Sequence, residues 1–414
     1  MSSLKPVRGT RDILADDILR HRHVEETARA VASRYGYAEI STPIFEFTEV
    51  FARTLGDTSD IVTKEMYTFE DKGGDRITLR PEGTAGVARA FISEGLAQNL
   101  PLKFFYRGPM FRYERPQKGR LRQFHQIGVE LLGVVRPLAD VEVIALGAHI
   151  LDALGLAGKV VCELNSLGDG ESRDAYRARL VDYLKDHKDR LSADSRERLE
   201  RNPLRILDSK DETDREIVAG APLMSDSLND ESRRFFDALL KGLETAGVPY
   251  RINPRLVRGL DYYCHTAFEF TTDALGAQGT VLAGGRYDGL IRQMGGPQTP
   301  GIGWAAGVER LAMLVEGAPK AARPLVVIPI GEEAEERAFA VTQGLRRAGF
   351  AVDLGFSGNL GKRMKRANAL NARAAVILGG DEMARGAAAV RDMDSGEQAE
   401  VPLTVLEEHL GRFR

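Results

Sequence analysis

The chain has 414 residues, of which 43% are hydrophobic and 28% are charged, and its formal net charge at pH 7 is -3. This length predicts two or three domains, with enough apolar residues for a sizeable core. The near-neutral balance excludes a generally basic nucleic-acid-binding protein, so a nucleic-acid partner would have to be held by local basic patches.

Cysteine usage and hydropathy indicate the compartment. Cys162 and Cys264 are far apart and lack the paired spacing of a zinc site, which fits free thiols in a reducing cytoplasm. Residues 1–11 have no apolar core for a signal peptide, and no run approaches the roughly 18 apolar residues of a membrane span. We therefore expect a soluble, cytoplasmic protein with no membrane partner.

The first elements in chain order are a helix and an edge strand. Apolar residues recur at helical spacing across 16–35, with charges between them, and predict an amphipathic helix. Residues 37–43 change to a strand-like pattern that ends at Pro43. Because proline cannot donate to a sheet ladder, this strand should lie at an edge or an interface, which makes it a candidate dimer contact.

A hairpin and a second helix come next. Residues 66–79 predict two short strands around a Gly-Gly turn. Glu82 and Thr84 then lie where a strand gives way to a helix that extends to Leu96. These two side chains are candidates for a site, but helix capping alone would also explain them, because Glu and Thr near a first turn satisfy free N–H groups.

Residues 104–130 are the most informative stretch, with two strand-like ends and a basic loop in the middle. Arginine forks at such a turn suit bidentate contacts to phosphate or carboxylate oxygens, although solvated basic turns are also common on surfaces. The return strand favours a site, because unpaired buried polar atoms cost roughly 1–3 kcal/mol each and polar residues interrupt its apolar ones. The cations are Arg112, Arg115, Lys118, Arg120 and Arg122, and the interrupting residues are Gln123, His125, Gln126 and Glu130.

The middle of the chain predicts a helical insertion between core elements. Residues 138–154 predict a helix and residues 160–164 a short strand. From 172 to about 230 the sequence becomes dense in charges and helix-forming residues, and 230–246 predict a further amphipathic helix. We therefore expect a small helical domain inserted at about 172–230.

Three later stretches mix glycine with polar and aromatic residues. Residues 255–270 and 281–290 have strand-like surroundings that suit a pocket for a small polar ligand. Residues 301–314 predict a glycine-rich strand that continues into a helix, with Arg310 in its early turns. Small residues there would let a flat ring or a phosphate approach the backbone.

The C-terminal part predicts a separate module. Residues 316–324 are rich in Ala, Pro and Lys and indicate a linker. Beyond them, strands and helices alternate, which predicts a small α/β domain with a mixed sheet. The expected strands are 325–330, 351–354, 374–378, 387–391 and 399–403, and the expected helices are 333–348, 360–370 and 404–413.

Taken together, these stretches resemble the histidyl-tRNA synthetases, a family of class II aminoacyl-tRNA synthetases, from Lys5 to the C-terminus. The strand ending at Pro43 is similar to motif 1, residues 105–130 to motif 2 and residues 301–314 to motif 3. Two motifs specific to histidine enzymes are also matched. They are Arg258-Gly-Leu-Asp-Tyr-Tyr263 and Ala283-Gly-Gly-Arg-Tyr-Asp288.

The resemblance implies an α+β fold. A class II catalytic domain with an antiparallel sheet would occupy 1–318 and contain the insertion, and a linker at 319–324 would join it to an anticodon-binding α/β domain at 325–414. The implied reaction converts L-histidine and ATP to histidyl-adenylate and pyrophosphate. The histidyl group then passes to the 3′ end of tRNA(His), and the enzyme would act as a homodimer.

The resemblance also implies how histidine is recognised. Imidazole offers two ring nitrogens, and a site with an acceptor and a hydroxyl can satisfy both, so a wrong side chain would leave buried polar groups unpaired. The histidine-binding residues would be Glu82, Thr84 and Gln126 at the α-amino group, Glu130 and Tyr263 at the imidazole, and Tyr262 and Tyr287 at the pocket wall.

For ATP, the resemblance implies converging arginines. Arg112 and Arg258 would be the catalytic pair at the α-phosphate, Arg310 would bind the γ-phosphate, and Arg120 would also contact ATP. Guanidinium groups fit a transition state that gathers charge on the α-phosphorus. Mg²⁺ would bridge the phosphates, so no metal held in a protein cage is expected.

The resemblance places tRNA on two basic segments. These are the hairpin loop, with Arg115, Gln117 and Lys118, and the second helix of the C-terminal module, with Lys362, Arg363, Lys365 and Arg366. Without this resemblance, a run of charges such as that of the second helix would indicate only a solvated face.

Two alternatives belong to other classes. A synthetase-like regulatory subunit of ATP phosphoribosyltransferase typically loses the arginine matched by Arg258 and lacks the C-terminal module. Synthetases for glycine, proline or threonine share that type of module but lack the two histidine motifs.

Overall fold

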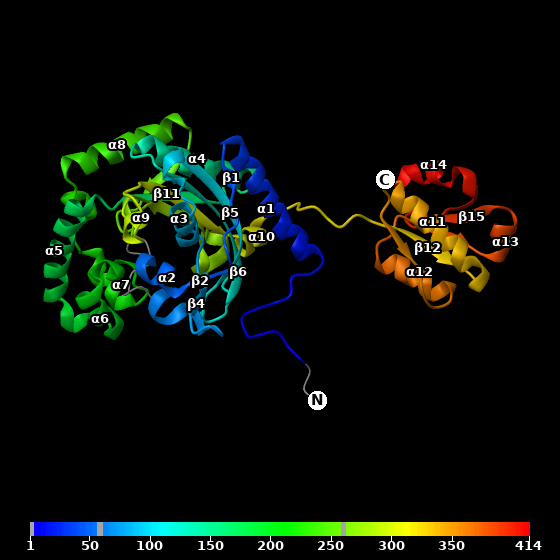
Figure 1. Ribbon diagram of the computed structural model, residues 1–414, viewed down its shortest axis with the longest axis horizontal. Coiled ribbons are helices and arrows are strands. Elements are labelled where there is room, and N and C mark those ends of the chain that lie inside the picture. Colours follow the sequence, from blue (N-terminus) through cyan, green and yellow to red (C-terminus); the bar gives the residue numbers. More distant parts are fainter. Residues whose placement is uncertain (1–3, 56–60, 258–261) are drawn as a thin grey trace. The chain divides into compact units, whose positions relative to one another are not determined.

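The computed structural model describes residues 4–55, 61–257 and 262–414. Arg258, one of the two residues expected to be catalytic, therefore lies outside the described residues. The chain divides into two compact units, Met1–Pro319 and Lys320–Arg414, and each is described by itself (Figure 1).

The first unit is built on an eight-stranded sheet in the order β1-β5-β6-β11-β10-β9-β7-β8. Its six central strands are antiparallel to their neighbours, as expected, while the edge strands β1 and β8 are parallel to theirs. The strands are β1 (Ala38–Glu39), β5 (Leu102–Phe111), β6 (Gln123–Leu132), β7 (Val161–Ser166), β8 (Tyr250–Ile252), β9 (Cys264–Thr271), β10 (Thr280–Arg286) and β11 (Gly301–Gly307).

The basic hairpin is confirmed as β5 and β6, which pair without a break from Leu102 opposite Leu132 to Phe111 opposite Gln123. On its other side, β6 pairs with the glycine-rich strand β11, with Glu130 opposite Gly303. The hairpin and the glycine-rich strand are far apart in sequence, and the sheet makes them neighbours.

Helices cover both faces of the sheet. One face packs on α1 (Asp16–Arg34), α4 (Pro137–Ala153), α8 (Asp230–Thr245) and α10 (Val308–Leu314), with a core that includes Val24, Ile144, Leu243, Trp304 and Leu311. The other face packs on α3 (Thr84–Ser93) and α9 (Leu290–Gln293), through Ala85, Phe91 and Leu290. The predicted helices 16–35, 138–154 and 230–246 are confirmed within one residue at each end.

The N-terminal strand is shorter than expected. Only Ala38–Glu39 pair with β5, instead of 37–43. The reason is that Pro43 has no N–H for a ladder and the carbonyl of Thr42 accepts a hydrogen bond from Arg80 at 2.9 Å. The strand does lie at the sheet edge, as the proline predicted.

A small second sheet holds the predicted hairpin of 66–79. Its strands are β2 (Phe45–Phe47), β4 (Arg76–Leu79) and β3 (Tyr67–Glu70), in that order. The sequence did not predict β2 or the helix α2 (Thr48–Leu55) that follows it, because each is short and lies next to the proline break.

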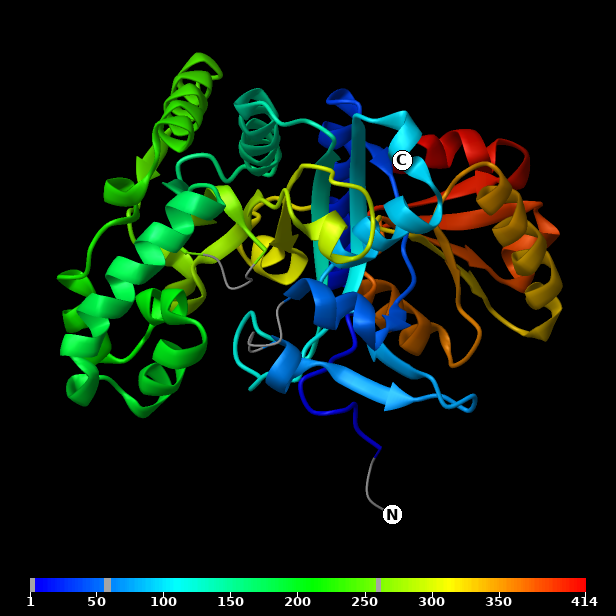
Figure 2. The ribbon, with the colours of Figure 1, turned by 60° about the vertical axis from the view of Figure 1, so that its left-hand side comes forward.

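The charged region forms the expected helical insertion, with α5 (Gly170–Asp186), α6 (Ala193–Arg201) and α7 (Glu212–Ala219) (Figures 1 and 2). It has an apolar core of its own. The carboxylate of Asp214 accepts hydrogen bonds of 2.6–2.8 Å from Ser192, Ser195 and Ser209, which join α7 to the start of α6.

The second unit has a mixed five-stranded sheet in the order β13-β12-β14-β15-β16, as the alternation predicted. The short helix α13 was not predicted, and the expected helix 404–413 is interrupted by 3-10 turns. The strands are β12 (Leu325–Pro329), β13 (Val352–Leu354), β14 (Ala374–Leu378), β15 (Ala387–Asp392) and β16 (Gln398–Pro402), and the helices are α11 (Glu335–Arg347), α12 (Leu360–Ala369), α13 (Gly380–Ala384) and α14 (Leu406–Leu410). Among the described residues, no helix combines the length and apolarity needed to cross a membrane.

Candidate active site

A pocket of about 290 Å³ lies in the first unit against β6, β10, β11 and the start of α3. It brings together most of the candidate residues of this unit. Its lining includes Glu82, Thr84, Arg112, Arg120, Gln126, Tyr262, Tyr263, Tyr287 and Arg310.

The other candidates lie elsewhere. Arg115, Gln117 and Lys118 are exposed on the hairpin loop and do not line the pocket. Lys362, Arg363, Lys365 and Arg366 are on α12 of the second unit.

Strand alternation explains which residues of β6 reach the pocket. Side chains two apart point to the same face, so Phe124 and Gln126 line the pocket and Glu130 follows on that face. His125 points to the opposite face, where it meets Glu309. The polar run in this strand therefore serves two different surfaces.

Glu130 lies directly beneath the pocket and is only 1% exposed. Its carboxylate accepts a hydrogen bond of 2.6 Å from the hydroxyl of Thr84 and another from the hydroxyl of Tyr287. Burial raises the pKa of Glu130 to about 8, against the opposing effect of these two hydrogen bonds. A Cβ on Gly303 would lie 1.9 Å from this carboxylate, so the glycine of β11 makes the space that Glu130 occupies.

Glu82 caps α3, as the simpler interpretation of the sequence suggested. Its two oxygens accept hydrogen bonds from the backbone N–H groups of Thr84 at 2.6 Å and Ala85 at 2.8 Å. The same carboxylate lines the pocket, and burial raises its pKa, although these backbone hydrogen bonds oppose the rise. Capping and ligand binding are therefore compatible here, because the cap holds the carboxylate in place.

Three guanidinium groups converge at the end of the pocket next to the hairpin loop. Arg112 donates from Nε to the carbonyl of Pro81 at 2.9 Å and lies over the ring of Phe124, while Arg120 forms an ion pair with Glu114. Arg310 donates to the carbonyl of Gly119 at 3.1 Å and to that of Thr280 at 2.7 Å. Burial lowers the pKa of Arg310, and the nearby charges of Arg120 and Arg112 lower it further.

The loop conformation that presents Gly119 to Arg310 requires glycine. Gly119 has a φ of +71°, in the left-handed region that side chains with a Cβ disfavour. The sequence identified this glycine only as a turn residue. The structure shows that its carbonyl helps to position a pocket arginine.

Sequence reasoning missed a buried ion pair that supports the pocket. Arg286, which is fully buried, donates from Nε to both carboxylate oxygens of Asp140, each at 3.1 Å. Strand alternation then directs the next residue, Tyr287, to the pocket face. The available sequence feature was Asp140, an acidic residue that stands between apolar residues in helix α4.

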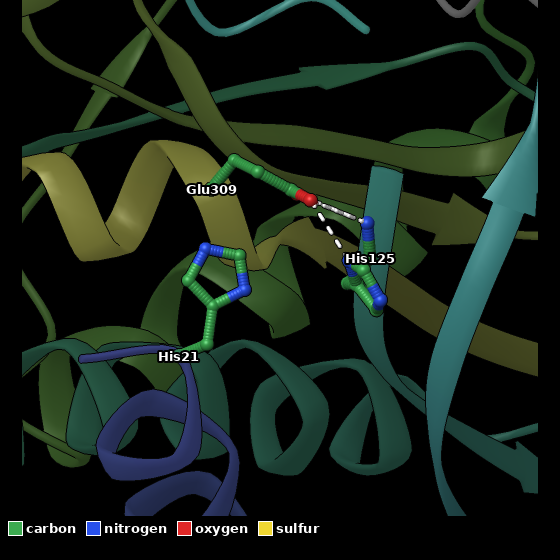
Figure 3. Close-up of side chains that lie close together, drawn as sticks. All are labelled: His21, His125 and Glu309. Carbon is green, nitrogen blue, oxygen red and sulfur yellow. Dashed lines mark hydrogen bonds and ion pairs between the residues drawn. The ribbon is translucent and has the colours of Figure 1, made fainter. Parts of the chain in front are cut away.

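Sequence reasoning also missed the role of Glu309, the residue before Arg310. Its carboxylate accepts two hydrogen bonds of 3.0 Å from the backbone N–H of His125 and lies 2.9 Å from the His125 ring nitrogen Nδ1 (Figure 3). These contacts join the first turn of α10 to β6. They help fix the helix from which Arg310 enters the pocket.

The fold and the pocket together define the class of this protein. A mainly antiparallel sheet, with buried carboxylates and tyrosines beside converging arginines and a separate α/β unit, is the architecture of a class II aminoacyl-tRNA synthetase. Residues 9–311 match the family model for histidyl-tRNA synthetase, and residues 325–412 match the model for an anticodon-binding domain.

Individual relatives agree with the family models. The chain is 68% identical over 417 residues to the histidine–tRNA ligase of Rhodospirillum rubrum, with 100% of both chains covered. It is 58% identical over 410 residues to that of Gluconacetobacter diazotrophicus, with 99% of both covered. The crystal structure of apo histidyl-tRNA synthetase from S. aureus superposes with a TM-score of 0.81 at 36% identity, covering 98% of this chain and 99% of that one.

The chain therefore belongs to the histidyl-tRNA synthetase family, whose members charge tRNA(His) with histidine through an adenylate. It is an enzyme of the aminoacyl-tRNA synthetase class.

Proposed function

We propose that the pocket activates L-histidine with ATP to histidyl-adenylate and that the histidyl group then passes to the 3′ end of tRNA(His). The polarity of the pocket along β6 carries this proposal. Arg112 lies over Phe124 near the hairpin loop, whereas Thr84 and Tyr287 meet Glu130 six residues further along the strand. An amino acid bound at the inner end and a nucleoside triphosphate bound at the loop end would match this order.

At the inner end, histidine would be recognised by Glu130, Tyr263 and Tyr287, with Glu82, Thr84 and Gln126 at the α-amino group. Three observations support this assignment. The carboxylates of Glu82 and Glu130 are buried, and the ring centroids of Tyr262 and Tyr263 are 4.5 Å apart. The carboxylate of Glu130 also accepts hydrogen bonds from two hydroxyl groups. A ligand that donates an N–H to Glu130 would stabilise its ionised form. A side chain without such a donor would leave this buried network unsatisfied.

At the loop end, Arg112, Arg120 and Arg310 would bind the phosphates of ATP. The carbonyls of Pro81, Gly119 and Thr280 and the carboxylate of Glu114 hold these guanidinium groups in place before ATP binds. The repulsion between like charges that are held close together decreases when an anion binds between them. Arg258, whose structure is not described, is proposed for the α-phosphate on its sequence motif alone.

The reaction needs no general base, because the carboxylate of histidine is already ionised when it attacks the α-phosphorus. Catalysis would then rest on orientation and on charge stabilisation as negative charge gathers on the α-phosphate oxygens. Arg112 is the described residue best placed for this role, since Nε is fixed by Pro81 and its side chain lines the pocket.

Mg²⁺ would enter with ATP and neutralise phosphate charge. Among the described residues, protein groups hold three carboxylates of the pocket: backbone N–H groups hold Glu82, Arg120 holds Glu114 and Thr280 holds Glu269. A magnesium ion that bridges phosphate oxygens and keeps several waters fits this arrangement.

We propose two contact regions for tRNA. The exposed loop residues Arg115, Gln117 and Lys118 would meet the acceptor end beside the pocket. On α12, Lys362 and Lys365 are exposed, whereas Arg363 donates to the carbonyl of Pro329 and Arg366 is paired with Asp353. The two lysines are therefore the main candidates for phosphate contacts at the anticodon stem-loop. The match of 325–412 to an anticodon-binding model supports this role.

We further propose that the enzyme is a homodimer that uses the outer face of the β2-β4-β3 sheet. Phe47, Ile77 and Phe69 lie in one row across the three strands, and Phe47 and Phe69 are 58% and 47% exposed. An exposed aromatic face of this kind marks an interaction surface. Sedimentation equilibrium should give a dimer for the wild type and a monomer for Phe47→Asp, while Glu70→Lys on the other face of β3 should stay dimeric.

We also propose a cytoplasmic location. Both cysteines, Cys162 and Cys264, are free thiols, as is usual for proteins of a reducing compartment.

The decisive experiment is exchange of pyrophosphate into ATP, measured with each of the twenty amino acids. We expect histidine to support exchange and the other nineteen to be inactive. Exchange with another amino acid but not with histidine would overturn the assignment. Absence of exchange, together with binding to an ATP phosphoribosyltransferase, would favour the regulatory alternative.

A further inference from the structure

A cluster of three potential metal ligands lies around His125, on the face of β6 opposite to Phe124 and Gln126, and one of its members, Glu309, also lines the edge of the active-site pocket. His21 comes from α1, His125 from β6 and Glu309 from α10. One ligand atom from each residue lies within 4.8 Å of the others. Figure 3 shows the ring of His21 facing the pair formed by His125 and Glu309.

Hydrogen bonds account for the positions of His125 and Glu309, but none accounts for the position of His21. Its side chain is buried, with 3% exposure, and among the described residues its ring makes no hydrogen bond. Its ring is edge-on to that of His125, with centroids 5.7 Å apart. The ring borders a cavity, so its nitrogens are open to water or to a ligand bound there.

We propose that His21, His125 and Glu309 bind a divalent transition-metal ion of the zinc type. Two imidazole nitrogens and one carboxylate oxygen form a ligand set that suits zinc and disfavours magnesium, which prefers oxygen ligands in an octahedral arrangement. Sequence reasoning does not identify this site, because its ligands are separated by about a hundred residues or more and have no metal-site spacing.

The geometry requires only small adjustments. Ligand atoms about 2.0–2.1 Å from a tetrahedral zinc lie roughly 3.4 Å apart, so the widest separation of 4.8 Å must close by side-chain rotation. The carboxylate of Glu309 is already held by the backbone N–H of His125, which is the kind of outer contact that orients metal-bound carboxylates.

An open coordination position has space beside it. A cavity of about 230 Å³ is lined by His21 and Glu309 together with the hairpin-loop residues Lys118 and Gly119. A water molecule or a small anion in this cavity would complete a four-coordinate site. Asp17 lies 3.7 Å from both Arg11 and Arg20 at the cavity rim and reduces the positive charge there.

The test is metal binding by the full-length enzyme without ATP. Metal-free protein is titrated with Zn²⁺ against a chromophoric chelator, and with Co²⁺ to record its visible spectrum. We expect one tight Zn²⁺ site, Co²⁺ bands of a four-coordinate nitrogen and oxygen site, and no comparable binding of Mg²⁺. Loss of His21 as a ligand should weaken Zn²⁺ binding by about tenfold or more.

Three variants separate this site from adventitious binding. His21→Ala removes the ligand, His21→Phe removes it but keeps a buried ring, and His23→Ala is the matched control on the same helix. We expect both His21 variants to lose affinity and His23→Ala to keep it. Zn²⁺ should raise the unfolding temperature of the wild type and of His23→Ala but not that of His21→Phe.

Three results would overturn the proposal. One is equal Zn²⁺ affinity in the wild type and His21→Phe, and another is an equal loss in His23→Ala. The third is an intense near-ultraviolet thiolate band with Co²⁺, because that would assign the binding to Cys162 or Cys264.

Discussion

The two ends of the active-site pocket are built in different ways. At the inner end, the carboxylate of Glu130 is 1% exposed and is covered by the hydroxyls of Thr84 and Tyr287. At the loop end, Arg112 and Arg310 are partly exposed and are fixed by backbone carbonyls. The inner end can therefore select a ligand whose hydrogen bonds satisfy the buried polar groups. The loop end can attract any phosphate by charge.

Substrate specificity and the rate of reaction should therefore depend on different ends of the pocket. A buried network penalises a wrong ligand by leaving polar groups unpaired. Preorganised arginines act mainly on charge that develops in the transition state. Changes at the inner end should alter histidine binding, and changes at the loop end should alter the rate of adenylate formation.

The largest effect is expected at the loop end. Arg112→Ala should lower the rate of adenylate formation by about 10²- to 10³-fold, as when one preorganised donor to a transition-state oxyanion is removed. Arg258→Ala should behave similarly if its proposed role is correct. Single-turnover assays should show a much smaller loss in transfer from preformed adenylate to tRNA, because the α-phosphate is by then part of the leaving group.

The exposed Arg22→Ala on α1 serves as the control for these two variants. Equal losses in adenylate formation and in transfer, or an unfolded variant, would mean that the arginine in question is structural.

The next effect is expected at the inner end. Glu130→Gln should raise the Michaelis constant for histidine by about ten- to a hundredfold, because a charged hydrogen bond to a ligand contributes roughly 1.5–3 kcal/mol. The Michaelis constant for ATP should change little. Steady-state pyrophosphate exchange measures both values. If ATP binding weakens and histidine binding does not, Glu130 is not in the imidazole site.

The buried carboxyl also predicts a pH dependence of stability. The pKa of Glu130 is raised from an ordinary 4.5 to about 8 by burial. Between these values the folded state binds more protons than the unfolded state, so this residue makes the enzyme less stable as pH rises. The slope is at most about 1.4 kcal/mol per pH unit and ends above pH 8.

Urea unfolding of the wild type and Glu130→Gln at pH 5, 6, 7 and 8, without ligands, checks this slope. The difference in unfolding free energy should move steadily in favour of the glutamine variant as pH rises. A difference that does not vary with pH would show that Glu130 is ionised throughout this range in the folded enzyme.

The smallest effect is expected from variants on α12, which leave both ends of the pocket unaltered. Lys362→Ala with Lys365→Ala should weaken tRNA binding and reduce its salt dependence by about one unit per lysine, because each phosphate contact releases counterions. Pyrophosphate exchange should not change. Arg347→Ala, exposed on α11, is the control. Unchanged salt dependence in the double variant would remove α12 from the proposed tRNA surface.

Much of the fold followed from local patterns. Helices α1, α4 and α8 and the β5–β6 hairpin follow from apolar periodicity and from the turn around Pro116 and Gly119. The elements that were not predicted, such as β2, α2 and α13, are short. The strand expected at 37–43 was too long because the side chain of Arg80, distant in sequence, takes the carbonyl of Thr42.

For the site, the sequence indicated residue types better than it indicated their partners. The arginines of the hairpin, the polar residues of β6 and the Gly-Gly-Arg-Tyr motif were all identifiable as candidates. Resemblance to a known family supplied their proposed roles. The ion pair between Arg286 and Asp140 and the contacts of Glu309 with His125 could not be predicted, since each joins residues more than a hundred positions apart.

Periodicity, turn residues and charge are local properties, so the secondary-structure elements and the available side-chain chemistry follow from the amino-acid sequence. The burial of Glu130 beneath Tyr287, and the position of His125 opposite His21 on the other face of the same strand, depend on the tertiary fold. Burial, pKa and hydrogen-bond partners all depend on which strands become neighbours. Pairing of β6 with β11 placed Gly303 opposite Glu130 and so made room for the buried carboxylate.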